Sequence, residues 1–126
     1  MPAKLLDFNT VVITGGGGGL GFAMAEWLIR QKGKKVILAG RTESNLKEAS
    51  SKLDGAPYYV LDTGKVDTIK PFAEKVIKEH PEVDALMNNA GVQRPLEVTN
   101  LDLQKVDQEI DIVRRLDRTS LSLRLL

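Results

Sequence analysis

A threonine and a run of glycines near the start of the chain form the pattern with the clearest chemistry. The stretch TGGGGGLG, residues 14–21, follows the apolar run TVVI and precedes FAMAEWLI. Bare glycine backbone lets a phosphate approach the N–H groups at the start of a helix. The glycines fit G-x-G-x-x-G, T-G-x-x-G-x-x-G and T-G-x-x-x-G-x-G at once, so the run alone does not select one nucleotide fold. A Walker phosphate loop is excluded, because no Lys-Ser or Lys-Thr follows Gly21.

The composition is that of an ordinary soluble globular chain. The 126 residues include 18 basic and 17 acidic side chains, and this balance indicates neither nucleic acid nor a membrane surface as a partner. There is no cysteine and only one histidine, so we expect no disulfide, thiolate chemistry or metal site. No apolar run approaches the roughly 20 residues of a membrane span. We therefore expect a cytoplasmic protein.

Short apolar runs alternate with longer amphipathic stretches along the chain. The runs predict strands at residues 10–14, 35–39, 56–62 and 83–88. The amphipathic stretches predict helices at 20–31, from Thr42 or Ser44 to about 53, at 65–80, and from about 101. Such alternation predicts an α/β fold, a Rossmann-like doubly wound parallel sheet of about four strands in the order 3-2-1-4.

A second motif, NNAG at residues 88–91, follows the fourth predicted strand. Together, TGGGGGLG and NNAG resemble the N-terminal, cofactor-binding part of the short-chain dehydrogenase/reductase family, whose pattern is T-G-x-x-x-G-x-G followed by N-N-A-G. The segment LDTGKVD, residues 61–67, is similar to the family's acidic strand end that contacts adenine. The resemblance extends from about Phe8 to Ile110 and implies a nicotinamide dinucleotide cofactor.

The resemblance implies roles for the matching residues on the pyrophosphate side. Thr14 and the pair Asn88–Asn89 would hold the loop and the central strands in place. The residues that would surround the pyrophosphate are Gly15, Gly19, Gly21 and, through its amide, Leu20.

On the adenosine side, the resemblance implies a carboxylate and a set of backbone contacts. Asp62 would accept a hydrogen bond from the adenine amino group, with the backbone of Thr63 beside it. Ala90 and Gly91 would line the adenosine ribose, next to Asn89.

The end of the second predicted strand bears on the choice of cofactor. An NAD-selective site has a carboxylate there, which accepts a hydrogen bond from the ribose 2′-hydroxyl. This chain has Gly40 and then Arg41, and a guanidinium suits a 2′-phosphate. A solvated loop arginine is the alternative interpretation. The sequence favours NADP(H) over NAD(H).

The catalytic pattern of the family is missing from these residues. The family uses a tyrosine with a lysine four residues later as its proton donor and ribose anchor. The only tyrosines are Tyr58 and Tyr59, and Asp62 and Thr63 stand at the lysine offset. We predict no catalytic residue in this chain. Two functions stay open: an oxidoreductase of the family, or a non-catalytic dinucleotide-binding or regulatory module.

The last 16 residues, DIVRRLDRTSLSLRLL, differ in composition from the rest. They hold four arginines, five leucines and none of the chain's lysines. We expect a Rossmann-type domain over 1–110 and an atypical tail of the same domain over 111–126, from an altered reading frame or a premature terminus. Because the sequence predicts no fifth strand, the 83–88 strand would have one edge of unpaired N–H and C=O groups, which favours pairing with another chain. Alternation at residues 121–125 could add a short strand. We predict self-association through the edge or the final helix.

Overall fold

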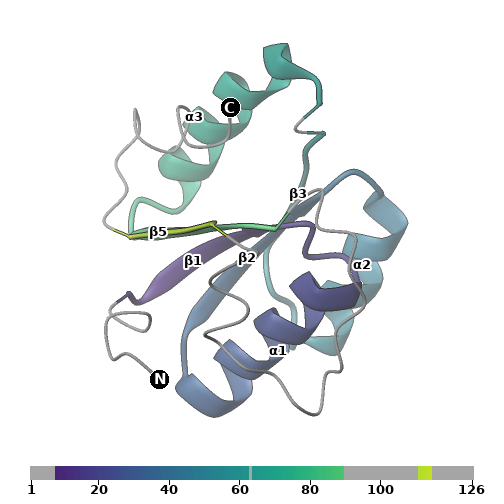
Figure 1. The fold of residues 1–126 in the computed structure, drawn as a ribbon, viewed down its shortest axis with the longest axis vertical. Helices are drawn as coiled ribbons and strands as arrows, with labels where there is room; N and C mark the ends of the chain where they lie inside the picture. Colours follow the sequence, from purple (N-terminus) through teal and green to yellow (C-terminus); the bar gives the residue numbers. More distant parts are fainter. Residues whose placement is uncertain (1–7, 63, 90–110, 115–126) are drawn as a thin grey trace.

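Four parallel strands and one antiparallel strand form a single sheet with helices on both faces (Figure 1). The computed structural model describes residues 8–62, 64–89 and 111–114. In these ranges the strands are β1 (Thr10–Thr14), β2 (Lys35–Gly40), β3 (Tyr58–Val60), β4 (Ala85–Asn88) and β5 (Asp111–Arg114). The helices are α1 (Gly19–Lys32), α2 (Glu43–Lys52) and α3 (Ile69–Glu79), and a 3-10 turn, η2 (Val66–Thr68), precedes α3.

The order of the strands is β3-β2-β1-β4-β5. The first four are parallel to one another, which confirms the predicted doubly wound sheet and its order 3-2-1-4. Helices α1 and α2 lie on one face of the sheet and α3 lies on the other, as the ribbon shows (Figure 1).

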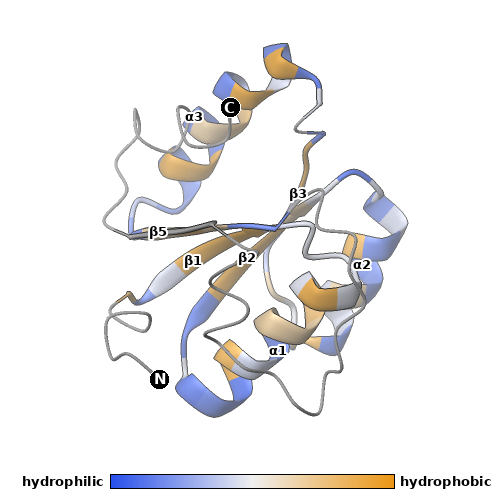
Figure 2. Cartoon of the chain, in the orientation of Figure 1, coloured by the Kyte–Doolittle hydropathy of each residue, from blue (hydrophilic) through white to orange (hydrophobic). Residues whose placement is uncertain are grey.

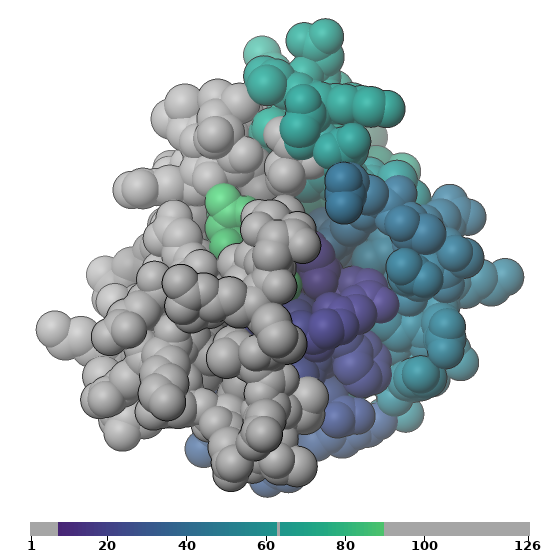
Figure 3. Space-filling view, turned by 45° about the vertical axis from the view of Figure 1, so that its right-hand side comes forward, coloured from purple at the N-terminus to yellow at the C-terminus, as the bar shows by residue number. Residues whose placement is uncertain are grey.

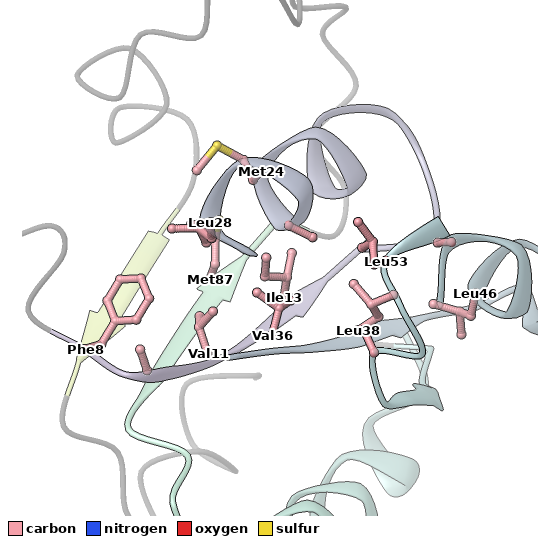
Figure 4. Packing of buried hydrophobic residues seen from close by; sticks show 14 residues of the cluster. Phe8, Val11, Ile13, Met24, Leu28, Val36, Leu38, Leu46, Leu53 and Met87 are labelled. Carbon is pink, nitrogen blue, oxygen red and sulfur yellow. The ribbon is translucent and has the colours of Figure 1, made fainter. Parts of the chain in front are cut away.

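Residues of β1 alternate between two apolar layers of the core. Val11 and Ile13 pack with residues of α1 and α2, including Met24 and Leu46 (Figure 4). Val12 belongs to the opposite layer, which α3 covers. All five residues of β1 are buried, as expected for a parallel strand that is covered on both faces. This double burial explains why Val11, Val12 and Ile13 follow one another without an alternating polar residue.

Hydrophobic and hydrophilic residues alternate along α3 in the colouring by hydropathy (Figure 2). In α3 the buried positions follow the three-to-four-residue spacing of an amphipathic helix: Ile69, Phe72, Ala73 and Val76. Helix α1 is capped at its C-terminus by Gly33, whose φ of 63° is in the left-handed region. None of the helices in the described ranges is long and apolar enough to cross a membrane.

Two predicted elements differ in length from the observed ones by more than two residues. The strand expected over 56–62 is assigned only over Tyr58–Val60, and Pro57, which has no N–H to donate, precedes it. The helix expected over 65–80 is divided into η2 and α3. Pro71 is the third residue of α3, a position where its missing N–H has no helical acceptor.

The expected open edge of the sheet is wrong, because β5 pairs with the outer side of β4. The two strands are antiparallel, with Asp111 opposite Asn88 and Arg114 opposite Ala85. Ile112 and Val113 are β-branched and favour an extended backbone. Self-association through the β4 edge therefore loses its structural basis. The final helix expected from about 101 and the alternation at 121–125 lie outside the described residues.

Candidate cofactor-binding site

The carboxyl ends of the parallel strands meet at one edge of the sheet. Thr14 pairs with Ala39, and Gly40 pairs with Val60, so β1, β2 and β3 end side by side. In an open α/β sheet, ligands bind outside this edge, where the order of the strands reverses. The loop Gly15–Gly18 connects β1 to α1 at this position, so the fold brings the glycine run to the expected side of the sheet.

Two glycines of the run are needed for the close approach of α1 to β1. A Cβ atom on Gly21 would lie 2.1 Å from the carbonyl oxygen of Gly15 and 2.7 Å from Asn89 Nδ2. Gly15 has a φ of 70°, a left-handed conformation that glycine adopts without strain. The backbone N–H of Gly16 then donates to the carbonyl of Ala39 at 3.0 Å, which ties the loop to β2.

Two other glycines leave space above the start of α1. A Cβ on Gly18 or Gly19 would meet no atom within 4 Å. Gly19, the first residue of α1, has a φ of 56°. The first N–H groups of a helix have no partner within the helix, and they favour an anion in front of them. The bare backbone at Gly18 and Gly19 fits the pyrophosphate of a dinucleotide.

Thr14 and the Asn88–Asn89 pair join the ends of β1 and β4. The Thr14 hydroxyl accepts the N–H of Asn89 at 2.8 Å and donates to Asn88 Oδ1 at 3.0 Å. Asn89 Nδ2 donates in turn to the carbonyl of Gly15 at 3.4 Å. Asn89 is 6% exposed, and within the described part of the chain its Oδ1 has no hydrogen-bond partner. The arrangement holds the glycine loop against β4 and leaves one buried acceptor at the site.

Arg41 stands at the end of β2, beside a cavity of about 170 Å³. The side chain of Arg41 is exposed, and the ion pairs found among the described residues do not include it. The other walls of the cavity come from the glycine loop and the start of α2: Gly15, Gly17, Gly18, Gly40, Thr42, Asn45 and Leu46. In the space-filling view, purple atoms from the early part of the chain reach the surface next to blue atoms of residues that follow (Figure 3).

Asp62 follows β3 at the same edge, and part of its carboxylate is engaged by its own turn. Its Oδ1 accepts the N–H of Gly64 at 2.9 Å, and its backbone carbonyl accepts the N–H of Lys65 at 2.9 Å. The contact of Asp62 with an adenine amino group stays a prediction, and its Oδ2 accepts none of the hydrogen bonds found among the described residues. Thr63, Ala90 and Gly91, which were predicted to lie beside the adenosine, are outside the described residues.

Sequence reasoning missed the wall that α2 contributes to the site. Thr42 and Asn45 line the cavity, but neither belongs to the two motifs. The signal that could have found them is their place at the start of the helix that follows Arg41, Thr42 as its N-cap and Asn45 in its first turn. A larger cavity of about 760 Å³ lies along β3, between α2 and α3, and includes none of the predicted site residues.

The fold and the loop define a dinucleotide-binding α/β protein, and the comparison with known sequences narrows this class. The family described as short chain dehydrogenase matches residues 9–114. The chain belongs to this family, the short-chain dehydrogenases/reductases, whose members are oxidoreductases that use a nicotinamide dinucleotide.

Relatives show how much of a family member is present. The uncharacterized oxidoreductase DltE of Bacillus subtilis is 36% identical over 102 residues, which cover 81% of this chain and 38% of that protein. Short-chain dehydrogenase/reductase 3 of Homo sapiens is 34% identical over 98 residues, or 73% of this chain and 32% of the human protein. The chain spans less than half the length of these relatives.

Among solved structures, a variant of actinorhodin polyketide ketoreductase with NADPH matches 95% of this chain and 48% of its own, with a TM-score of 0.63. At 21% sequence identity this likeness shows the fold alone. A second solved structure, of the dehydrogenase Cj0485, is 27% identical with a TM-score of 0.56, over 82% of this chain and 40% of its own.

Proposed function

We propose that the chain is an NADP(H)-binding part of a short-chain dehydrogenase/reductase, and that it selects NADP(H) over NAD(H) through Arg41. The observation that carries the proposal is the exposed guanidinium of Arg41, which has no ion pair in the described residues and stands at the rim of a cavity beside the glycine loop. Gly40 replaces the carboxylate that an NAD site would place at this strand end.

The charges around the cavity agree with an extra phosphate on the adenosine ribose. Among its lining residues, Arg41 is charged and the others are glycines, Thr42, Asn45 and Leu46. A 2′-phosphate would thus meet a cation and no carboxylate in that wall. When bound, the dinucleotide supplies the hydride that oxidoreductases of this family transfer. The chain's own contribution is to hold the pyrophosphate at Gly18 and Gly19 and the 2′-phosphate at Arg41.

Isothermal titration calorimetry of the chain with NADPH and with NADH tests the proposal. We expect NADPH to bind more tightly by about 1–2 kcal/mol, the contribution of a charge-assisted contact in a partly exposed site. Arg41→Ala should remove this preference and leave the affinity for NADH unchanged. Lys47→Ala, which removes an exposed cation of α2 outside the cavity, serves as the control and should preserve the preference. Equal affinities for the two nucleotides in the unmodified chain would overturn the proposal.

A second candidate function is binding of the dinucleotide without catalysis. The observation that favours it is the lack of a tyrosine followed four residues later by a lysine anywhere in the 126 residues. Hydride transfer to a carbonyl needs a proton donor beside it. We therefore expect no turnover of NADPH or NADP⁺ with a panel of aldehydes, ketones and alcohols. Nucleotide consumption that disappears in Gly19→Val would instead assign catalysis to this chain.

The cytoplasmic location expected from the sequence stays a prediction.

A further inference from the structure

The outer edge of β3 is open in the described part of the chain. Strand β3 stands at one end of the sheet, whereas β5 covers β4 at the other end. The cavity of about 760 Å³ lies along β3 between α2 and α3, so neither helix covers this edge. Val60 lines the cavity and is 52% exposed, one of two large apolar side chains among the described residues with such exposure.

The backbone of β3 has free hydrogen-bonding groups on this side. Pro57 and Leu61 both face β2: the Pro57 carbonyl accepts an N–H of β2 at 2.8 Å, and the Leu61 N–H donates to a carbonyl of β2 at 2.7 Å. Successive residues of a strand direct their N–H and C=O groups to opposite sides. The groups of Tyr58 and Val60 therefore face the outer edge, where no strand among the described residues pairs with them.

This edge lacks the features that protect an edge strand from other chains. Charged side chains, prolines and bulges serve this purpose in most sheets. The strand consists of Tyr58, Tyr59 and Val60, and none of them is charged. Pro57 does not protect the outer side, because the position of its missing N–H faces β2. An uncharged edge of this kind accepts a further strand.

Two copies of β3 match each other when they run antiparallel. A two-fold axis at Tyr59 places Tyr58 of one copy opposite Val60 of the second, and Tyr59 opposite Tyr59. Because Tyr58 and Val60 both face outward, the two residues of each such pair exchange both of their main-chain hydrogen bonds. The side-chain pairs are then aromatic with β-branched and aromatic with aromatic, two combinations that stabilise neighbouring strands.

The charges on the α3 side of the cavity also suit a second copy. Lys75 Nζ lies 5.7 Å from the centroid of the Tyr59 ring, and Glu79 accepts the Tyr59 hydroxyl. The ion pairs found among the described residues include neither Lys75 nor Glu79. When two Tyr59 side chains meet at the axis, each copy brings one cation and one carboxylate to it. Lys75 of one copy thus has Glu79 of the second as a charge of opposite sign.

We infer that the outer edge of β3 is a dimerisation surface, to which a second copy of this chain adds its own β3 in antiparallel register about Tyr59. The inference does not depend on the proposed function. The two sheets become one continuous sheet across the axis. Because the paired strands have only three residues each, we expect the dimer to dissociate on dilution, as small interfaces do.

Sedimentation equilibrium of the full 126-residue chain, from micromolar to millimolar concentration, tests the inference. The mass should rise from 13.9 kDa toward twice this value. Val60→Lys should raise the dissociation constant by about tenfold, since it places a charge opposite Tyr58 twice in each dimer. Val66→Lys is the matched control, because Val66 is 61% exposed and lies outside the cavity. Its dissociation constant should stay within about twofold of the unmodified value.

Val60→Pro tests the main-chain hydrogen bonds of the edge. It removes an N–H that faces away from β2, so we expect the variant to fold. Its dissociation constant should rise at least as much as that of Val60→Lys. Val60→Thr keeps the N–H and the β-branched shape, and should associate more tightly than Val60→Pro. Urea unfolding of each variant shows that it is folded under the conditions of the sedimentation experiment.

Amide exchange locates the contact within the chain. The Val60 N–H should exchange more slowly as the protein concentration rises. A chain that stays at 13.9 kDa up to millimolar concentration would overturn the inference. Equal effects of Val60→Lys and Val66→Lys would also overturn it, because the contact then lies elsewhere. Slow exchange of Val60 at every concentration would show that a segment of the same chain covers the edge, and would exclude a second copy from it.

Discussion

Gly21, in the first turn of α1, lies directly against the carbonyl oxygen of Gly15, the residue that follows β1. A Cβ on Gly21 would be 2.1 Å from that oxygen, which is too close for any real side chain. The contact fixes how near the helix comes to the strand, and with it the position of the N–H groups in front of a phosphate.

Gly21→Ala should therefore force the helix away from β1. We expect the free energy of unfolding to fall by about 1–3 kcal/mol or more, the range for overpacked sites, and nucleotide affinity to fall with it. Gly18→Ala is the matched control, because its φ is 179° and a Cβ there meets nothing within 4 Å. Its free energy of unfolding should change by less than about 1 kcal/mol. Urea denaturation measures the free energy of unfolding of the two variants. An equal decrease in both would contradict the prediction.

A second prediction concerns Asp84, which holds the start of β1. Its carboxylate accepts the N–H of Asn9 at 3.0 Å and the N–H of Thr10 at 2.9 Å. Asp84→Asn replaces one acceptor oxygen by an NH₂ group that faces these donors. We expect a loss of about 1–2 kcal/mol in the free energy of unfolding for this half-buried site.

Glu74→Gln, the same chemical change on an exposed residue of α3, is the control for Asp84→Asn. Its denaturation midpoint should match that of the unmodified chain. An unchanged midpoint for Asp84→Asn as well would mean that the carboxylate does not stabilise the start of β1.

A third prediction concerns the ionisation of Tyr59. Partial burial of the phenol, together with its hydrogen bond to Glu79 and the charge of that carboxylate, raises the pKa of Tyr59 above its ordinary value. The unfolded chain releases this proton near pH ~10. The protonated Tyr59 phenol therefore stabilises the folded chain. This contribution to the free energy of unfolding is complete below pH ~10 and is lost as the pH rises from there through the pKa of Tyr59 in the folded state.

The phenolate absorbance of a Tyr58→Phe variant reports Tyr59 alone. We expect its titration in the folded chain at higher pH than in urea, and Glu79→Gln should bring it closer to the unfolded value. Identical titrations with and without urea would contradict the assignment.

A fourth prediction follows from the pairing of β4 with β5. Ile112 and Val113 lie opposite Met87 and Leu86, and one of two successive N–H groups on a strand faces its partner. Replacing both by proline removes that donor and disfavours the pairing. Light scattering should show a larger mass for Ile112→Pro/Val113→Pro than for the unmodified chain of 13.9 kDa. Equal masses would mean that β5 does not protect the edge.

The self-association predicted through the final helix is read from the same measurement. Because the residues of that predicted helix lie outside the described ones, its part in self-association is tested by the mass of the unmodified chain alone. A monodisperse 13.9 kDa species at tens of micromolar would remove the prediction.

The sequence was sufficient to predict the parallel part of the sheet, because strands buried on both faces are continuous β-branched or apolar runs, as in β1 and β2. It was not sufficient to predict β5, whose four residues stand in a segment with few other strand signals. A strand this short is decided by the partner that it finds, here β4, and not by its own propensity.

The candidate site could be predicted to a similar extent. The motifs identified the glycine loop and Arg41, since both are defined by local sequence. They could not separate the six glycines of residues 15–21 by role, because the need for Gly21 depends on the distance to Gly15 and the freedom of Gly18 depends on what lies above α1. Asn45 was missed for the same reason, since its proximity to Gly17 is a property of the packing of α2.

The two apolar layers on either side of β1 have a consequence for how the strand finds its alignment. In a sheet with one solvent-exposed face, a slip of a strand by one residue moves its apolar side chains into solvent, and this cost disfavours the slipped alignment. A slip of β1 by one residue would move Val12 into the layer that holds Val11 and Ile13, and would move those two into the layer of Val12. Both layers are apolar, so burial alone does not oppose the slip. Polar contacts fix the two ends of β1. The N–H of Thr10 donates to Asp84, and the hydroxyl of Thr14 accepts the N–H of Asn89, and a shifted strand would lose both hydrogen bonds. They make a single alignment of the strand lower in free energy than the shifted ones.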